Sequence, residues 1–97
     1  MELLRVVSST TIGKKYTAIF YNKETGRKKR TSFGARGMDD YTITHDKEQR
    51  ERYRTRHKKD LTTDDPTRAG FLSYYILWGP STSMDENIRY YKKKFHL

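Results

Sequence analysis

The hydrophobic positions in the first third of the chain form the short apolar runs of a β-sheet. Residues 3–7 read Leu-Leu-Arg-Val-Val and residues 16–21 read Tyr-Thr-Ala-Ile-Phe-Tyr, both rich in β-branched and aromatic side chains. The second run ends in Asn-Lys-Glu-Thr-Gly, which is typical of a hairpin whose Gly26 takes a positive φ. Residues 27–33 then return antiparallel, so the pattern predicts a three-stranded antiparallel β-meander.

Four successive basic residues open the third predicted strand: Arg27, Lys28, Lys29 and Arg30. Because side chains alternate across a strand, two of these charges fall on each face. Charges on both faces hinder pairing with a further strand. We therefore expect this strand at an edge of the sheet.

Beyond the Gly-Ala-Arg-Gly link at 34–37, the hydrophobic pattern changes to a helical period. Residues 45–60 contain neither Gly nor Pro, and Thr44 is the expected cap. The apolar line of this segment is thin and consists of Tyr53, His57 and Leu61. The pattern predicts a mostly solvated helix that touches the core along one stripe.

Two further helices are predicted in the last third of the chain. Asp65 and Pro66 are expected to open a helix that is apolar almost all round and ends at Gly79-Pro80, which places it at the centre of the fold. Ser83 and Glu86 have the spacing of a capping box for the last helix. The apolar stripe of that helix consists of Met84, Ile88, Tyr91 and Phe95. The predicted fold class is α+β, a three-stranded meander followed by three helices packed on one face.

Length and composition indicate one small basic domain over residues 1–97. Hydrophobic residues make up only 33% of the chain, and the mean hydropathy is -1.07. A core this lean gives marginal stability, so a partner that binds the folded form would stabilise the protein appreciably. The chain has no cysteine and no apolar run long enough for a membrane span, and its first residues are too polar for a signal peptide. We expect a protein that is not secreted.

The net charge of +9 favours an acidic partner. One candidate surface is the strand run 27–30, and a second is a helix face on which basic residues are spaced three, four and four apart. This face consists of Lys47, Arg50, Arg54 and Lys58. Arg36 adds a charge within the glycine-flanked link. Phosphate binding, docking to an acidic protein and plain solvation all remain open for these residues.

No arrangement in the sequence indicates catalysis. His45 and His57 lie twelve residues apart, about 18 Å along a helix, too far to share a metal ion. The paired carboxylates at 39–40 and 64–65 sit where turns and caps favour Asp. There is no phosphate-binding glycine loop and no nucleophile motif. We expect a protein that is not an enzyme, with no cofactor and no small-molecule substrate.

Five runs of residues carry a resemblance to a known family. They are 33–43 (FGARGMDDYTI), 52–57 (RYRTRH), 65–73 (DPTRAGFLS), 76–78 (ILW) and 91–95 (YKKKF). Over residues 15–97 the chain resembles a family of small basic proteins of unknown function encoded by large nucleocytoplasmic double-stranded DNA viruses of algae and protists. The resemblance implies a viral product and transfers no catalytic residue.

The resemblance leaves two kinds of partner for a small basic protein, the proteins of the capsid and the nucleic acid of the genome. We expect a non-enzymatic minor capsid protein that cements the shell by binding neighbouring capsid or virion proteins. The alternative is a nucleic-acid-binding protein that contacts the phosphate backbone through the basic helix and strand. Either setting implies a location in the virion, or in the cytoplasm or nucleus of the infected cell.

Overall fold

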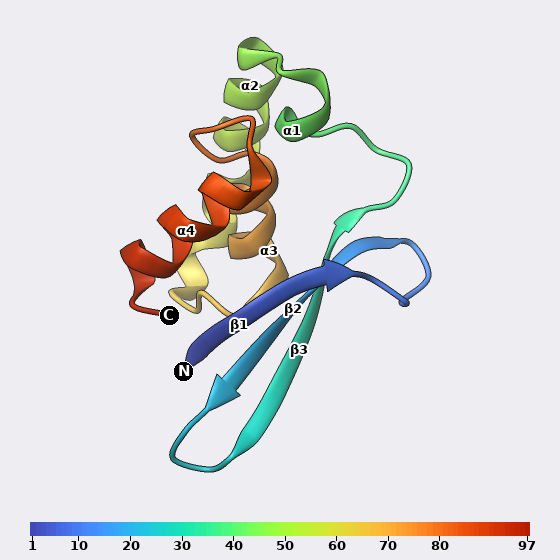
Figure 1. Cartoon of the computed structure of the whole chain (residues 1–97). Helices are drawn as coiled ribbons and strands as arrows, with labels where there is room; N and C mark the ends of the chain where they lie inside the picture. Colours follow the sequence, from blue (N-terminus) through green and yellow to red (C-terminus); the bar gives the residue numbers. More distant parts are fainter.

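The computed structural model describes all 97 residues and contains the predicted sheet. Its strands are β1 (Glu2–Ser8), β2 (Lys14–Asn22) and β3 (Arg27–Ala35), antiparallel and in the order β1-β2-β3 (Figure 1). The meander is therefore confirmed, and β3 lies at an edge as expected. Gly26 has a φ of 70°, and its N–H donates to the Asn22 carbonyl at 2.8 Å. This closes the predicted hairpin turn.

The strand register divides the sheet into a covered and an open face. The covered face carries Leu3, Ala18, Phe20 and Phe33, which belong to the buried core. A bulge at Leu4 shifts the register of β1 between Leu3 and Arg5. On the open face the cross-strand rows are Glu2–Tyr21–Lys28, Arg5–Ile19–Arg30 and Val7–Thr17–Ser32.

The helical elements gather on one side of the sheet (Figure 1). They are α1 (Tyr41–Thr44), α2 (Lys47–His57), the 3-10 helix η1 (Lys58–Thr63), α3 (Ala69–Leu72), the π-helix η2 (Ser73–Leu77) and α4 (Met84–Phe95). The α+β class is confirmed. None of these helices is long and apolar enough to cross a membrane.

The predicted cap of the first helix was wrong. Asp46 accepts hydrogen bonds from the backbone N–H groups of Glu48 at 3.0 Å and Gln49 at 3.1 Å, so α2 begins at Lys47. Thr44 instead ends the short helix α1, which the sequence did not predict. Asp40 caps α1 by accepting the Thr42 N–H at 2.9 Å. Asp46 caps α2 in place of Thr44 because a carboxylate accepts hydrogen bonds more strongly than a hydroxyl group.

The predicted start of the central helix was also wrong. Asp65 accepts the N–H of Thr67 at 3.0 Å and its hydroxyl at 2.6 Å, and the Arg68 N–H donates to the Asp65 carbonyl at 3.1 Å. These bonds form a turn, and α3 begins only at Ala69. The Thr31 hydroxyl donates to the Thr67 carbonyl at 2.8 Å. That bond connects the turn to β3, and it engages the Thr67 carbonyl with a side chain of the sheet.

The segment α3–η2 is central, as its all-round apolar pattern predicted. Its buried residues pack between the covered face of the sheet and α4, where Tyr91 is fully buried. The segment ends at Leu77, with Trp78 as its C-cap. A Cβ at Gly79 would lie 2.1 Å from the Tyr75 carbonyl oxygen. Glycine is therefore required there for a steric reason.

The helix α4 follows the predicted stripe but only half of the predicted capping box. The Glu86 N–H donates to the Ser83 hydroxyl at 3.3 Å. The Glu86 carboxylate does not return to Ser83, because it accepts the hydroxyl of Ser81 at 2.7 Å. Buried Asn87 holds the connection between η2 and α4, because its amide group donates to the carbonyls of Ile76 and Ser81 at 2.9 and 2.8 Å.

Candidate functional site

The basic helix face expected from the sequence is divided between structure and solvent. The Arg50 Nε donates to the Gly79 carbonyl at 2.6 Å. The Arg54 guanidinium donates to the Trp78 carbonyl at 2.7 Å and lies 4.0 Å from the centre of the Tyr74 ring. These two cations satisfy the carbonyls at the C-terminal end of η2, where the helix dipole favours positive charge.

The other two members of that face remain free. Lys47 and Lys58 are exposed, and neither forms an ion pair or a side-chain hydrogen bond. Lys47 begins α2 and Lys58 follows its last residue. Of the predicted row of four, two separated charges therefore remain for a partner, while Arg52 and Arg56 are exposed elsewhere on α2.

Two more of the expected binding residues hold the sheet in place. The Lys29 ammonium donates to the Thr67 hydroxyl at 2.7 Å, on the covered face. The Arg36 guanidinium donates to the Ser9 and Lys14 carbonyls, both at 3.1 Å, and so closes the loop between β1 and β2. Arg27 pairs with Asn22 at the hairpin and is exposed.

The open face of the sheet collects the remaining strand charges. Arg5 and Arg30 flank Ile19 in the central row, and Lys28 stands in the neighbouring row. Ile19 is only 5% exposed although it lies outside the core beneath the helices. Cross-strand neighbours shield such a position with their aliphatic stems and keep their charged heads in water. Two guanidinium groups therefore stand over the middle of this face.

These sheet-face charges have no carboxylate partner within 4.0 Å. None of the five ion pairs of the protein includes Arg5, Lys28 or Arg30, and the one that involves this face joins Lys23 to Glu2 at 4.0 Å. Glu2 is the only acid in the three rows and sits at their end, beside Tyr21. The positive potential of the face is therefore largely uncompensated.

A cleft of about 540 Å³ lies between α2 and the segment that follows β3. One polar pair in its wall is already engaged, because Lys15 pairs with buried Asp40 at 2.7 Å. One wall is a stack in which the Tyr53 ring lies 4.3 Å from Trp78 and 4.1 Å from His57. Burial, with a smaller contribution from Asp60, raises the pKa of Tyr53 above its usual value. The cleft mixes acidic and basic side chains, and so it does not form a basic surface.

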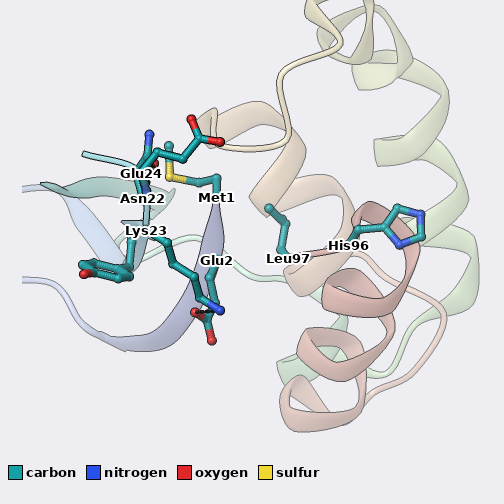
Figure 2. Close-up of a pocket in the computed structure, with 8 residues that line it drawn as sticks. Met1, Glu2, Asn22, Lys23, Glu24, His96 and Leu97 are labelled. Atoms are coloured by element: carbon teal, nitrogen blue, oxygen red, sulfur yellow. Dashed lines mark hydrogen bonds and ion pairs between the residues drawn. The ribbon is translucent and has the colours of Figure 1, made fainter. Parts of the chain in front are cut away.

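A second cavity, of about 520 Å³, opens where the two ends of the chain approach each other. Figure 2 shows Met1 and the hairpin residues 22–24 on one side and Leu97 on the other, with the His96 ring turned away. Glu2 and Glu24 balance Lys23 here. Because acidic and basic side chains both line the cavity, it does not extend the positive charge of the open face of the sheet.

One member of the open face was missed by sequence reasoning. Arg5 sits in an apolar run, Leu-Leu-Arg-Val-Val, that does not alternate, and so no face is assigned to it from the sequence. The bulge at Leu4 is what restores the alternation and brings Arg5 opposite Ile19. The signal in the sequence is the pair Leu3-Leu4 before Arg5, which interrupts the alternation expected of a strand and so indicates a bulge.

Comparison with known proteins places the chain in a family. Residues 4–57 match the model of a family of unknown function (DUF5754), and the chain belongs to this family. The matched segment runs from within β1 to the end of α2 and contains all of β2 and β3. No curated protein and no solved structure matches the chain.

Proposed function

We propose that this member of the DUF5754 family is a non-enzymatic nucleic-acid-binding protein that contacts the phosphate backbone through the open face of its sheet. The observation that carries the proposal is the central row of that face. Arg5 and Arg30 stand on either side of buried Ile19, unpaired and exposed. Their guanidinium groups present N–H donors in the planar geometry that phosphate oxygens accept.

The composition of the face favours backbone contacts over base contacts. Tyr21 is its only aromatic side chain, so it offers one stacking platform and no series of them. Its cations bind phosphates by releasing condensed counterions, a contribution that does not depend on base sequence. We therefore expect binding with little sequence preference and a strong dependence on salt.

The test is a salt titration of the purified full chain with duplex DNA, followed by fluorescence anisotropy. Three sheet-face cations, Arg5, Lys28 and Arg30, predict a log–log slope of affinity against salt of about -2.7, from about -0.9 per neutralised phosphate. A slope near zero, or no binding at about 50 mM salt, would contradict the proposal.

The second candidate function is that of a minor capsid protein of a large DNA virus. It is supported by exposed apolar side chains on and beside the edge strand β1. Leu4 is 42% exposed and Val7 38%, and Ile12 in the following loop is 99% exposed. An apolar strand edge suits strand addition by a neighbouring protein. In this case Leu4→Lys and Ile12→Lys should abolish capsid association, while Arg30→Gln leaves it intact.

A further inference from the structure

A small hollow lies on the open face between the end of β1, the loop after it and β3. It measures about 160 Å³ and is lined by seven residues, of which five carry hydroxyl groups and none is acidic. The lining residues are Val7, Ser8, Thr10, Thr11, Thr17, Arg30 and Ser32. The hollow is therefore rich in hydrogen-bond donors and carries one fixed positive charge.

The hydroxyl groups at its floor form a short chain. The Ser32 hydroxyl lies 3.1 Å from the Thr11 hydroxyl and 3.1 Å from the Thr17 hydroxyl. Three hydroxyl groups supply three O–H donors, and the two bonds between them use only two. One donor of this chain is left for a further acceptor, in addition to the free N–H groups of Arg30.

The size of the hollow limits what it can hold. Pockets that enclose a whole drug-sized or nucleotide-sized ligand measure about 300–1,000 Å³. A volume of about 160 Å³ accommodates a single tetrahedral oxyanion instead. Such an anion would complement both the charge of Arg30 and the unused hydroxyl donor.

We propose that this hollow binds one phosphate group, supplied by the nucleic-acid backbone; the identity of that source rests on the proposed function. The Arg30 guanidinium neutralises the phosphate, and the hydroxyl of Thr17, at one end of the hydroxyl chain, donates to one of its oxygens. The hollow then fixes the register of the backbone on the sheet, while the guanidinium of Arg5 and the ammonium of Lys28 contact neighbouring phosphates.

The first arm of the test compares duplex DNA binding of paired variants across salt concentrations. Arg30→Gln should flatten the salt slope by about one unit. Thr17→Val keeps the shape of the side chain and removes a neutral donor, so affinity should fall by about tenfold at unchanged slope. The matched controls are Arg27→Gln on the same strand and Thr55→Val on α2, both outside the hollow. Each control should change the affinity for DNA by less than about threefold.

The second arm uses inorganic phosphate and the backbone amide NMR signals of the protein alone. Phosphate should shift the amide signals of Thr11, Thr17 and Ser32 saturably, and Arg30→Gln should remove the effect. If the wild type binds DNA but Thr17→Val and Arg30→Gln behave like their controls, the hollow is not a phosphate site although the proposed function stands. If DNA does not bind while phosphate shifts these signals, the proposed function fails and the oxyanion site stands. Failure of both arms overturns both.

Discussion

Replacing Arg54 should destabilise the protein without weakening nucleic-acid binding. Its guanidinium donates to the Tyr74 carbonyl at 3.2 Å and the Trp78 carbonyl at 2.7 Å. Arg54→Met keeps the stem of the side chain and removes both bonds and the contact with the Tyr74 ring. Hydrogen bonds from charged groups contribute about 1.5–3 kcal/mol each, and a cation–π contact about 0.5–2 kcal/mol. Since Arg54 is only half-buried and solvent screens its contacts, we expect a loss slightly below the sum of the lower values, about 3 kcal/mol.

The assay is urea unfolding followed by Trp78 fluorescence. With a slope of about 2 kcal/mol per molar urea, a loss of about 3 kcal/mol lowers the midpoint by about 1.5 M. Arg52→Met is the matched control, because Arg52 lies on the same helix, is exposed and has no hydrogen-bond partner. Its midpoint should move by less than about 0.3 M, the shift expected of a surface substitution. Equal midpoints for the two variants would refute the assignment of Arg54 to the end of η2.

Three further changes test the packing and the pH dependence. Asn87→Ala leaves buried backbone groups without partners, so urea unfolding should show a loss of about 3 kcal/mol; a loss below about 1 kcal/mol would show that the turn is held by other contacts. Gly79→Ala places a Cβ against the Tyr75 carbonyl oxygen, and thermal melting should show a marked fall in Tm, whereas an unchanged Tm would contradict the close approach. Burial, with Asp65 as a smaller cause, raises the pKa of Tyr91, whose hydroxyl donates to the Pro66 carbonyl. The folded state therefore holds this proton more tightly than the unfolded chain. The stabilisation is complete below about pH 10 and is lost progressively as the pH rises from there through the higher pKa of the folded state. Tyr91→Phe should flatten the alkaline fall in unfolding free energy, and an unchanged fall would refute the role of this group.

The strands and the central helix were predictable because their signals are local. β-branched and aromatic runs separated by turn residues define a meander, and the position of Gly26 fixes the hairpin. The positions of the caps were harder to predict because one residue type serves several local structures. Asp46 caps a helix, whereas Asp65 accepts from Thr67 in a turn. That turn is also bonded to Lys29 and Thr31 of a distant strand, which the local sequence does not reveal.

The candidate site was predictable only in part. Helical spacing placed Arg50 and Arg54 on one face of α2, but spacing does not reveal what the face meets. The carbonyls that they contact belong to a segment more than twenty residues away in sequence. Arg5 was hidden by a bulge, and the hydroxyl chain joins Ser32 to two residues before the hairpin turn. These juxtapositions arise from tertiary packing and carry no local sequence signal.

The most direct test of nucleic-acid binding through the sheet is a comparison of two charge-matched triple variants. The first combines Arg5→Gln, Lys28→Gln and Arg30→Gln on the open face, and the second combines Lys47→Gln, Lys58→Gln and Lys59→Gln around α2. Each removes three positive charges, so general attraction to a polyanion falls equally. The measurement is the salt slope of duplex DNA affinity. We expect the sheet variant to lose nearly the whole slope, about 2.7 units, and the helix variant to lose less than about one. Equal losses, or a larger loss in the helix variant, would contradict binding through the open face of the sheet.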